Sequence, residues 1–106
     1  MIPELSPREF ARRRDAGEDL LLLDVREPDE VAAASVPGSL HIPMGEVPAR
    51  LSEVDRDREV VVLCRSGGRS LRVALFLKQQ GYGRVSNLSG GILRWAEELD
   101  PTLAAY

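Results

Sequence analysis

The chain has 106 residues, 43% of them hydrophobic and 29% charged. This fits one globular domain, residues 1–106, within the common range of about 100 to 150 residues. A net charge of −3 argues against binding to nucleic acid or to an anionic membrane. The single cysteine cannot form an internal disulfide, and the N-terminus shows no secretory signal. We therefore expect a cytoplasmic monomer.

The first part of the chain predicts a helix, a buried strand, a second short helix and a short strand. Ser6-Pro7-Arg8-Glu9 has the residues of a capping box with proline at the first helical position, and Gly17 is placed to end that helix. The run 20–25 is continuously apolar except for its one acid, as expected of a strand covered on both faces. Residues 27–34 favour a short helix, and residues 39–42 favour a short strand between prolines.

The second half continues the alternation of strands and helices. Its predicted elements are a helix over 44–54 with Pro48 in its first turn, a strand over 60–63, a helix over 70–80, a strand over 84–88 and a helix over 92–99. Alternating strands and helices with continuous apolar strands predict an α/β domain with a mostly parallel sheet and helices on both faces. The pattern leaves the strand order open.

Cys64 directly follows the predicted strand 60–63, and a helix is expected to begin about six residues later. Binding sites of open α/β sheets lie at this end of the strands. Gly67 and Gly68 allow backbone N–H groups to curl around an anion, and the helix N-terminus adds its positive dipole. Together with Arg65, Arg69 and Arg72 these features favour thiolate over thiol, so we expect a lowered pKa for Cys64.

A lone cysteine is more often a small buried hydrophobic residue than a nucleophile. The arginine-rich loop argues for the nucleophile, so we expect Val62 and Leu63, rather than Cys64, to be the core residues. Four residues separate Cys64 from Arg69. This loop is shorter than the phosphate-binding loop of cysteine-dependent phosphatases, so its smaller ring of N–H groups suits one extra sulfur atom better than a phosphoryl group. We therefore expect sulfur transfer.

Four segments resemble the conserved blocks of the rhodanese-type sulfurtransferase family, in the family's order. They are LLLDVREPDE at 21–30, VPGSLHIP at 36–43, CRSGGRS at 64–70 and NLSGGILRW at 87–95. The resemblance implies a rhodanese-like fold across nearly the whole chain. The loop and the C-terminus are also similar to the C-terminal rhodanese domain of enzymes that activate ubiquitin-like sulfur carriers.

The resemblance implies that Cys64 takes a sulfane sulfur from a small anionic donor such as thiosulfate and passes it, as a persulfide, to cyanide, to a thiol or to a sulfur-carrier protein. The implied donor-binding residues are Arg65, Ser66, Gly67, Gly68 and Arg69. Asp24 and Arg26 are expected to brace the loop through salt bridges, and Ser70 to support it. No cofactor beyond the covalent persulfide and no metal site are expected.

The sequence departs from the family pattern at Ser35, where histidine is common, and at Val31, where an aromatic residue is usual. Both positions belong to the framework. The sole histidine, His41, is expected to be structural. Two alternatives remain open: an interaction or relay module in a sulfur-carrier pathway, and a small cysteine phosphatase or arsenate reductase. The physiological donor and acceptor are not evident from the sequence.

Overall fold

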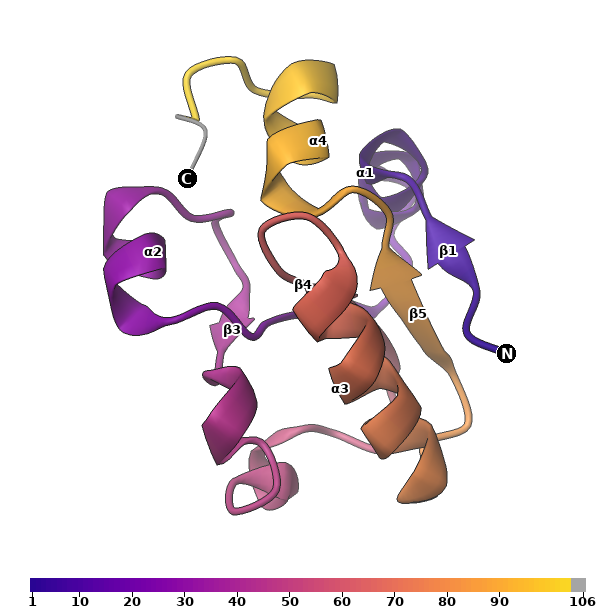
Figure 1. Ribbon diagram of the computed structural model, residues 1–106. Helices are drawn as coiled ribbons and strands as arrows, with labels where there is room; N and C mark the ends of the chain where they lie inside the picture. The colour runs from indigo at the N-terminus through magenta and orange to yellow at the C-terminus, as the bar shows by residue number, and fades with distance from the viewer. Residues whose placement is uncertain (104–106) are drawn as a thin grey trace.

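The computed structural model describes residues 1–103 and contains a five-stranded sheet in which every neighbouring pair of strands is parallel (Figure 1). The strand order is β1-β5-β4-β2-β3, so β4 is central. The strands are β1 (Glu4–Leu5), β2 (Leu20–Asp24), β3 (Leu40–His41), β4 (Glu59–Leu63) and β5 (Val85–Leu88).

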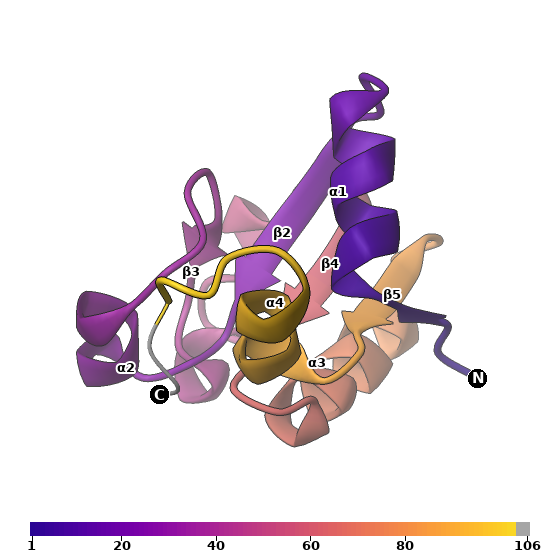
Figure 2. The ribbon, with the colours of Figure 1, turned by 90° about the horizontal axis from the view of Figure 1, so that it is seen from above.

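Helices cover both faces of the sheet, as predicted (Figure 2). One face carries α1 (Pro7–Asp15) and α4 (Gly91–Glu98); the other carries α3 (Gly68–Gln79). The helix α2 (Pro28–Ala33) lies beside β3, at one edge of the sheet. No helix within residues 1–103 is long and apolar enough to cross a membrane.

The two-residue side-chain period of the central strand creates a core on each side of the sheet. Val60 and Val62 of β4 belong to the cluster beneath α3, whereas Val61 and Leu63 belong to the cluster beneath α1 and α4. In the second cluster the rings of Phe10 and Trp95 pack together, with 5.7 Å between their centroids. A strand that is apolar at every position is thus explained by burial on both faces.

The ends of α1 follow the predicted signals. The Ser6 hydroxyl accepts from the Glu9 N–H at 3.1 Å, and the Glu9 carboxylate accepts from the Ser6 N–H at 3.3 Å, which completes the capping box. Gly17, with φ of +90°, follows the last turn. A similar hydrogen bond lies at the start of α2, where the Glu30 carboxylate accepts from the Glu27 N–H at 2.9 Å.

The prediction of a single helix over 44–54 is wrong. The segment forms two short 3₁₀ helices, η1 (Met44–Glu46) and η2 (Leu51–Glu53). Pro48 lies between them and has no N–H to donate to the carbonyl of Met44, so an α-helix cannot continue through it. The strand β1 is an addition to the prediction, because two residues are too few to show an alternating pattern.

A buried ion pair at the end of β2 joins three segments. Asp24 and Arg26 have no exposed side-chain area, and their Oδ2 and Nη2 atoms are 2.8 Å apart. Arg26 also donates to the carbonyl of Ala34 at 2.7 Å. His41 Nε2 lies 2.7 Å from the Arg26 carbonyl, which is consistent with the structural role expected of this histidine. The pair thereby ties α2 and β3 to β2.

Substitution Asp24→Asn should lower the free energy of unfolding by roughly 3 to 5 kcal/mol, because it leaves the Arg26 guanidinium buried without its counter-charge. Asp15→Asn is the matched control, since the Arg14–Asp15 pair is exposed; it should change stability by less than about 0.5 kcal/mol. Urea unfolding measures both. Equal losses in the two variants would contradict this account of the buried pair.

Candidate functional site

Cys64 directly follows the central strand and opens the loop that leads into α3. Its Sγ accepts a hydrogen bond from the Gly67 N–H at 3.0 Å and another from the Ser70 hydroxyl at 3.2 Å. Cys64 is 1% exposed and belongs to the α3-side core, so the expectation that it lies outside the core is wrong. The thiol is a buried group that is also held by hydrogen-bond donors.

The pKa of Cys64 reflects a competition between burial and hydrogen bonding. Burial raises it, because it disfavours the charged thiolate. The Ser70 side chain and the backbone N–H groups of Ser70, Gly67 and Ser66 lower it, and together they outweigh burial. The pKa therefore lies below its ordinary value, which increases the fraction of reactive thiolate near neutral pH.

The curl of the loop depends on Gly67. This residue is the N-cap of α3 and has φ of +113°, a backbone conformation that residues with a Cβ atom rarely adopt. It lets the Gly67 N–H turn back to the sulfur. The helix starts at Gly68, two residues earlier than predicted, so its first turn forms part of the loop.

The N-terminus of α4 holds the other side of the loop. The N–H groups of Ile92 and Leu93 donate to the carbonyls of Cys64 and Arg65 at 2.9 and 3.2 Å. A Cβ atom on Gly91 would lie 2.4 Å from the Arg65 carbonyl oxygen. The close approach of the two backbones explains why glycine is present at this position.

The two loop arginines differ in their partners. Arg69 forms two hydrogen bonds with the Glu30 carboxylate, at 2.6 and 2.8 Å. This pairing lowers the pKa of Glu30 to about 2 and raises the pKa of Arg69. Arg65 is exposed, and no ion pair joins it to a carboxylate within the part of the chain that the structure describes. The charge of Arg69 is therefore largely matched by Glu30, whereas that of Arg65 faces solvent.

Asp24 and Arg26 do not brace the loop in the way we expected. They pair with each other, and within residues 1–103 neither forms a salt bridge to the loop. Arg26 instead donates to the Glu30 carbonyl at 3.3 Å, while the Glu30 side chain holds Arg69. The support is indirect and runs through α2, because Arg26 is too deeply buried to reach the loop surface.

Asn87 of β5 is a site residue that the sequence reasoning did not single out. Its Oδ1 accepts from the Ser70 hydroxyl, and its amide nitrogen donates to the Gly67 carbonyl at 3.1 Å. It is 3% exposed. A polar residue in the buried run 85–88 is the signal that could have identified it, since buried amides require several partners.

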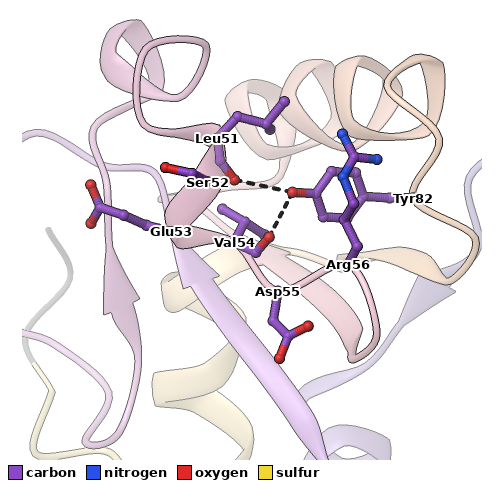
Figure 3. A pocket seen from close by; sticks show the side chains of 7 residues that line it. All are labelled: Leu51, Ser52, Glu53, Val54, Asp55, Arg56 and Tyr82. Atoms are coloured by element: carbon purple, nitrogen blue, oxygen red, sulfur yellow. Dashed lines mark hydrogen bonds between the residues drawn. The ribbon is translucent and has the colours of Figure 1, made fainter.

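A cavity of about 620 Å³ lies away from the cysteine, near the N-terminal ends of β4 and β5 (Figure 3). Tyr82 lies at its wall. Its hydroxyl is 2.6 Å from the Val54 carbonyl, to which it donates, and 3.1 Å from the Leu51 carbonyl, while Arg56 stacks on its ring. Its hydroxyl is already engaged with the backbone, as Figure 3 shows. This arrangement fastens η2 to the segment before β5.

The fold and the site define a parallel α/β domain with a hydrogen-bonded cysteine at the carboxyl end of its central strand. The chain belongs to the family of the rhodanese-like domain, which matches residues 6–98.

Comparisons with individual proteins agree with this assignment. A sulfurtransferase of Allochromatium vinosum is 45% identical over 104 residues, which cover 98% of this chain and 97% of the relative. An adenylyltransferase and sulfurtransferase of Zea mays is 32% identical over 116 residues, covering all of this chain but 24% of the relative. The crystal structure of a rhodanese-related protein from Thermoplasma volcanium superimposes with a TM-score of 0.84 at 30% identity, covering 98% of this chain and 99% of that one. The named relatives support a sulfurtransferase-type function.

Substitution Gly91→Ala should destabilise the protein and displace the cysteine loop, since the added methyl group meets backbone atoms that cannot rotate away. Gly38→Ala is the matched control, because Gly38 also has a positive φ (+83°) but a Cβ atom there meets nothing within 4 Å. We expect a loss of at least about 3 kcal/mol for the first variant and of about 1 to 2 kcal/mol for the second, which has the backbone strain alone. Thermal and urea unfolding test this. Similar stability of the two variants would show that the α4 contact is not tight.

The Glu30–Arg69 pair predicts an acid-sensitive contribution to stability. The Glu30 pKa of about 2 lies below its unfolded value of about 4.3, so the contribution is present above pH 4.3 and is lost as the pH falls toward 2. Glu30→Gln should be less stable than wild type at pH 7, and the difference should narrow by pH 3. Urea unfolding at both pH values measures it; a difference that does not narrow would contradict the pairing.

Proposed function

We propose that this protein transfers a sulfane sulfur from a small anionic donor, such as thiosulfate, to a thiophilic acceptor through a persulfide on Cys64. One observation carries the proposal: Cys64 Sγ lies in a short loop that points the Gly67 N–H and the Ser70 hydroxyl at it and lowers its pKa. Such surroundings stabilise a negatively charged sulfur, either as a thiolate or as a persulfide.

In the first step the Cys64 thiolate attacks the outer sulfur of thiosulfate. The new bond joins Sγ to that sulfur, and the sulfur–sulfur bond of the donor breaks. The bonding electron pair leaves with sulfite, which departs as a dianion. The outer sulfur keeps the negative charge that it carried in thiosulfate, the charge of the thiolate leaves with sulfite, and no proton or oxidant is required. This is covalent nucleophilic catalysis.

The loop backbone supplies donors for the persulfide. Gly68, Arg69 and Ser70 are the first residues of α3, where N–H groups have no acceptor within the helix. The positive end of the helix dipole lies at the same place. The helix dipole and these N–H groups favour a negatively charged outer sulfur. The N–H groups of Arg65, Ser66 and Gly67 would act in the same way.

The loop side chains have different proposed roles. Arg65, exposed beside the loop, would attract the anionic donor by its charge. Arg69 is held by Glu30 and would act mainly by fixing the first turn of α3. Of the two arginines that the family resemblance implied for donor binding, we propose only Arg65 as the charge that attracts the donor.

In the second step an acceptor attacks the outer sulfur and releases the Cys64 thiolate. Cyanide, which leaves as thiocyanate, is the acceptor for the assay; a thiol or a sulfur-carrier protein is the proposed acceptor in the cell. A Bacillus subtilis relative that is named a putative sulfur carrier protein supports the carrier; it is 42% identical over 94 residues, which cover 89% of this chain and 51% of the relative. We place the protein in the cytoplasm, because a reducing compartment keeps its one thiol reactive. The proposal also has the protein act as a monomer without another cofactor.

Intact mass of the wild type after incubation with thiosulfate, without reductant, should increase by one sulfur atom, and cyanide should remove that atom as thiocyanate. Cys64→Ser should gain nothing. Because the chain has one cysteine, the gain can be assigned to one position.

A wild type that gains no sulfur from thiosulfate or from other persulfide donors would overturn the proposal. Hydrolysis of an aryl phosphate that is lost in Cys64→Ser would then favour a phosphatase.

A further inference from the structure

The Ser70 hydroxyl lies between two atoms that can accept its single proton. Its Oγ is 3.2 Å from Cys64 Sγ and 2.5 Å from Asn87 Oδ1. Ser70 has no exposed surface, so water cannot supply a substitute partner. A hydroxyl carries one hydrogen, so it can donate fully to only one of these acceptors at a time.

The orientation of the Asn87 amide is determined by its other contacts. Its nitrogen lies 3.1 Å from the Gly67 carbonyl and 3.0 Å from a carboxylate oxygen of Glu4 in β1. Both neighbours are acceptors, so the nitrogen must face them and Oδ1 must face Ser70. Asn87 therefore presents a fixed acceptor to the hydroxyl that also contacts the sulfur.

We propose that Asn87, oriented by Glu4, is a positioning residue that competes with Cys64 for the Ser70 proton and thereby adjusts the reactivity of the sulfur. This inference rests on the proposed function, because it concerns the same cysteine. Asn87 acts through Ser70 and makes no direct contact with the sulfur in the hydrogen-bond network described above.

The competition follows the charge of Sγ through the reaction. When Sγ is a thiolate, the Ser70 proton turns toward it and the bond to Asn87 weakens. When Sγ becomes the inner atom of a persulfide it is neutral, the negative charge lies on the outer sulfur, and the proton returns to Asn87 Oδ1. The hydroxyl thus has a partner in both states, so neither state leaves it buried and unbonded.

The competing acceptor also limits how strongly the thiolate is stabilised. A thiolate that is stabilised too strongly is a weaker nucleophile, because nucleophilicity falls with pKa. The charged groups that face this region are Arg69 of α3, which is paired with Glu30 of α2, and Glu4 of β1, which lies behind Asn87; Arg65 is exposed in the loop. Asn87 is the uncharged residue that can change how strongly the Ser70 hydroxyl donates to Cys64 Sγ.

The test is the pKa of Cys64 in a double-mutant cycle of Asn87→Leu and Ser70→Ala. Leucine has nearly the shape of asparagine and offers no acceptor, so Asn87→Leu should lower the thiol pKa by roughly 0.5 to 1 unit. The rate constant for alkylation of the full thiolate should fall about twofold. Ser70→Ala should raise the pKa, and adding Asn87→Leu to it should cause no further change.

Ultraviolet absorbance of the thiolate during a pH titration gives the pKa. The difference between each variant and the same variant carrying Cys64→Ser removes the absorbance of the two tyrosines and leaves the signal of the single thiol. Ser86→Ala, a small change at a buried polar residue of the same strand, is the control and should leave the pKa unchanged. An unchanged pKa in Asn87→Leu, or a shift that persists in the Ser70→Ala background, would overturn the proposal.

If Asn87→Leu does not fold, Glu4→Ala and Glu4→Gln replace it, because Glu4 is exposed on an edge strand. Both variants remove the charge, but only alanine removes one of the two acceptors that orient Asn87, the other being the Gly67 carbonyl. A lower thiol pKa in Glu4→Ala than in Glu4→Gln supports the proposal, and equal values contradict it. The readout needs no sulfur donor, so failure of sulfur transfer and failure of this inference are distinguishable.

Discussion

The contact between the N-terminus of α4 and the carbonyls of Cys64 and Arg65 is the constraint on which the site depends. It engages those carbonyls from one side, so the N–H groups of the loop can turn toward the sulfur on the other. The contact requires Gly91, because any side chain there would meet the loop backbone. The last helix of the domain is thus part of the wall around a cysteine that lies 27 residues earlier (91 − 64).

Neutral dipoles, rather than arginine charges, are the main lowering influence on the thiol pKa. Hydrogen bonds from Ser70 and from loop N–H groups oppose the cost of burial, while Arg69 of α3 is paired with Glu30. Fixed dipoles stabilise charge without the reorganisation that mobile side chains or water require. A nearly buried sulfur can therefore become an anion in a site that contains little excess positive charge.

The sequence was informative where a feature is local. Continuous apolar runs predicted the parallel sheet, and the Ser6–Glu9 box predicted the start of α1, because both depend on residues close together in the chain. The Glu30–Arg69 pair and the Glu4–Asn87 contact join residues 39 and 83 positions apart, so no local pattern could indicate them. The helix expected over 44–54 does not form. Pro48 was expected to fit in its first turn, whereas a helix that begins at Met44 needs an N–H at residue 48.

The edge strand β1 has a consequence for how the protein is handled. It has two residues and pairs with β5, so few backbone hydrogen bonds hold it at the edge of the sheet, although its Leu5 belongs to the core beneath α1 and α4. Its Glu4 nevertheless reaches the amide that contacts Ser70. An affinity tag fused ahead of Met1 would join the chain three residues before this contact, so it can disturb the surroundings of the sulfur.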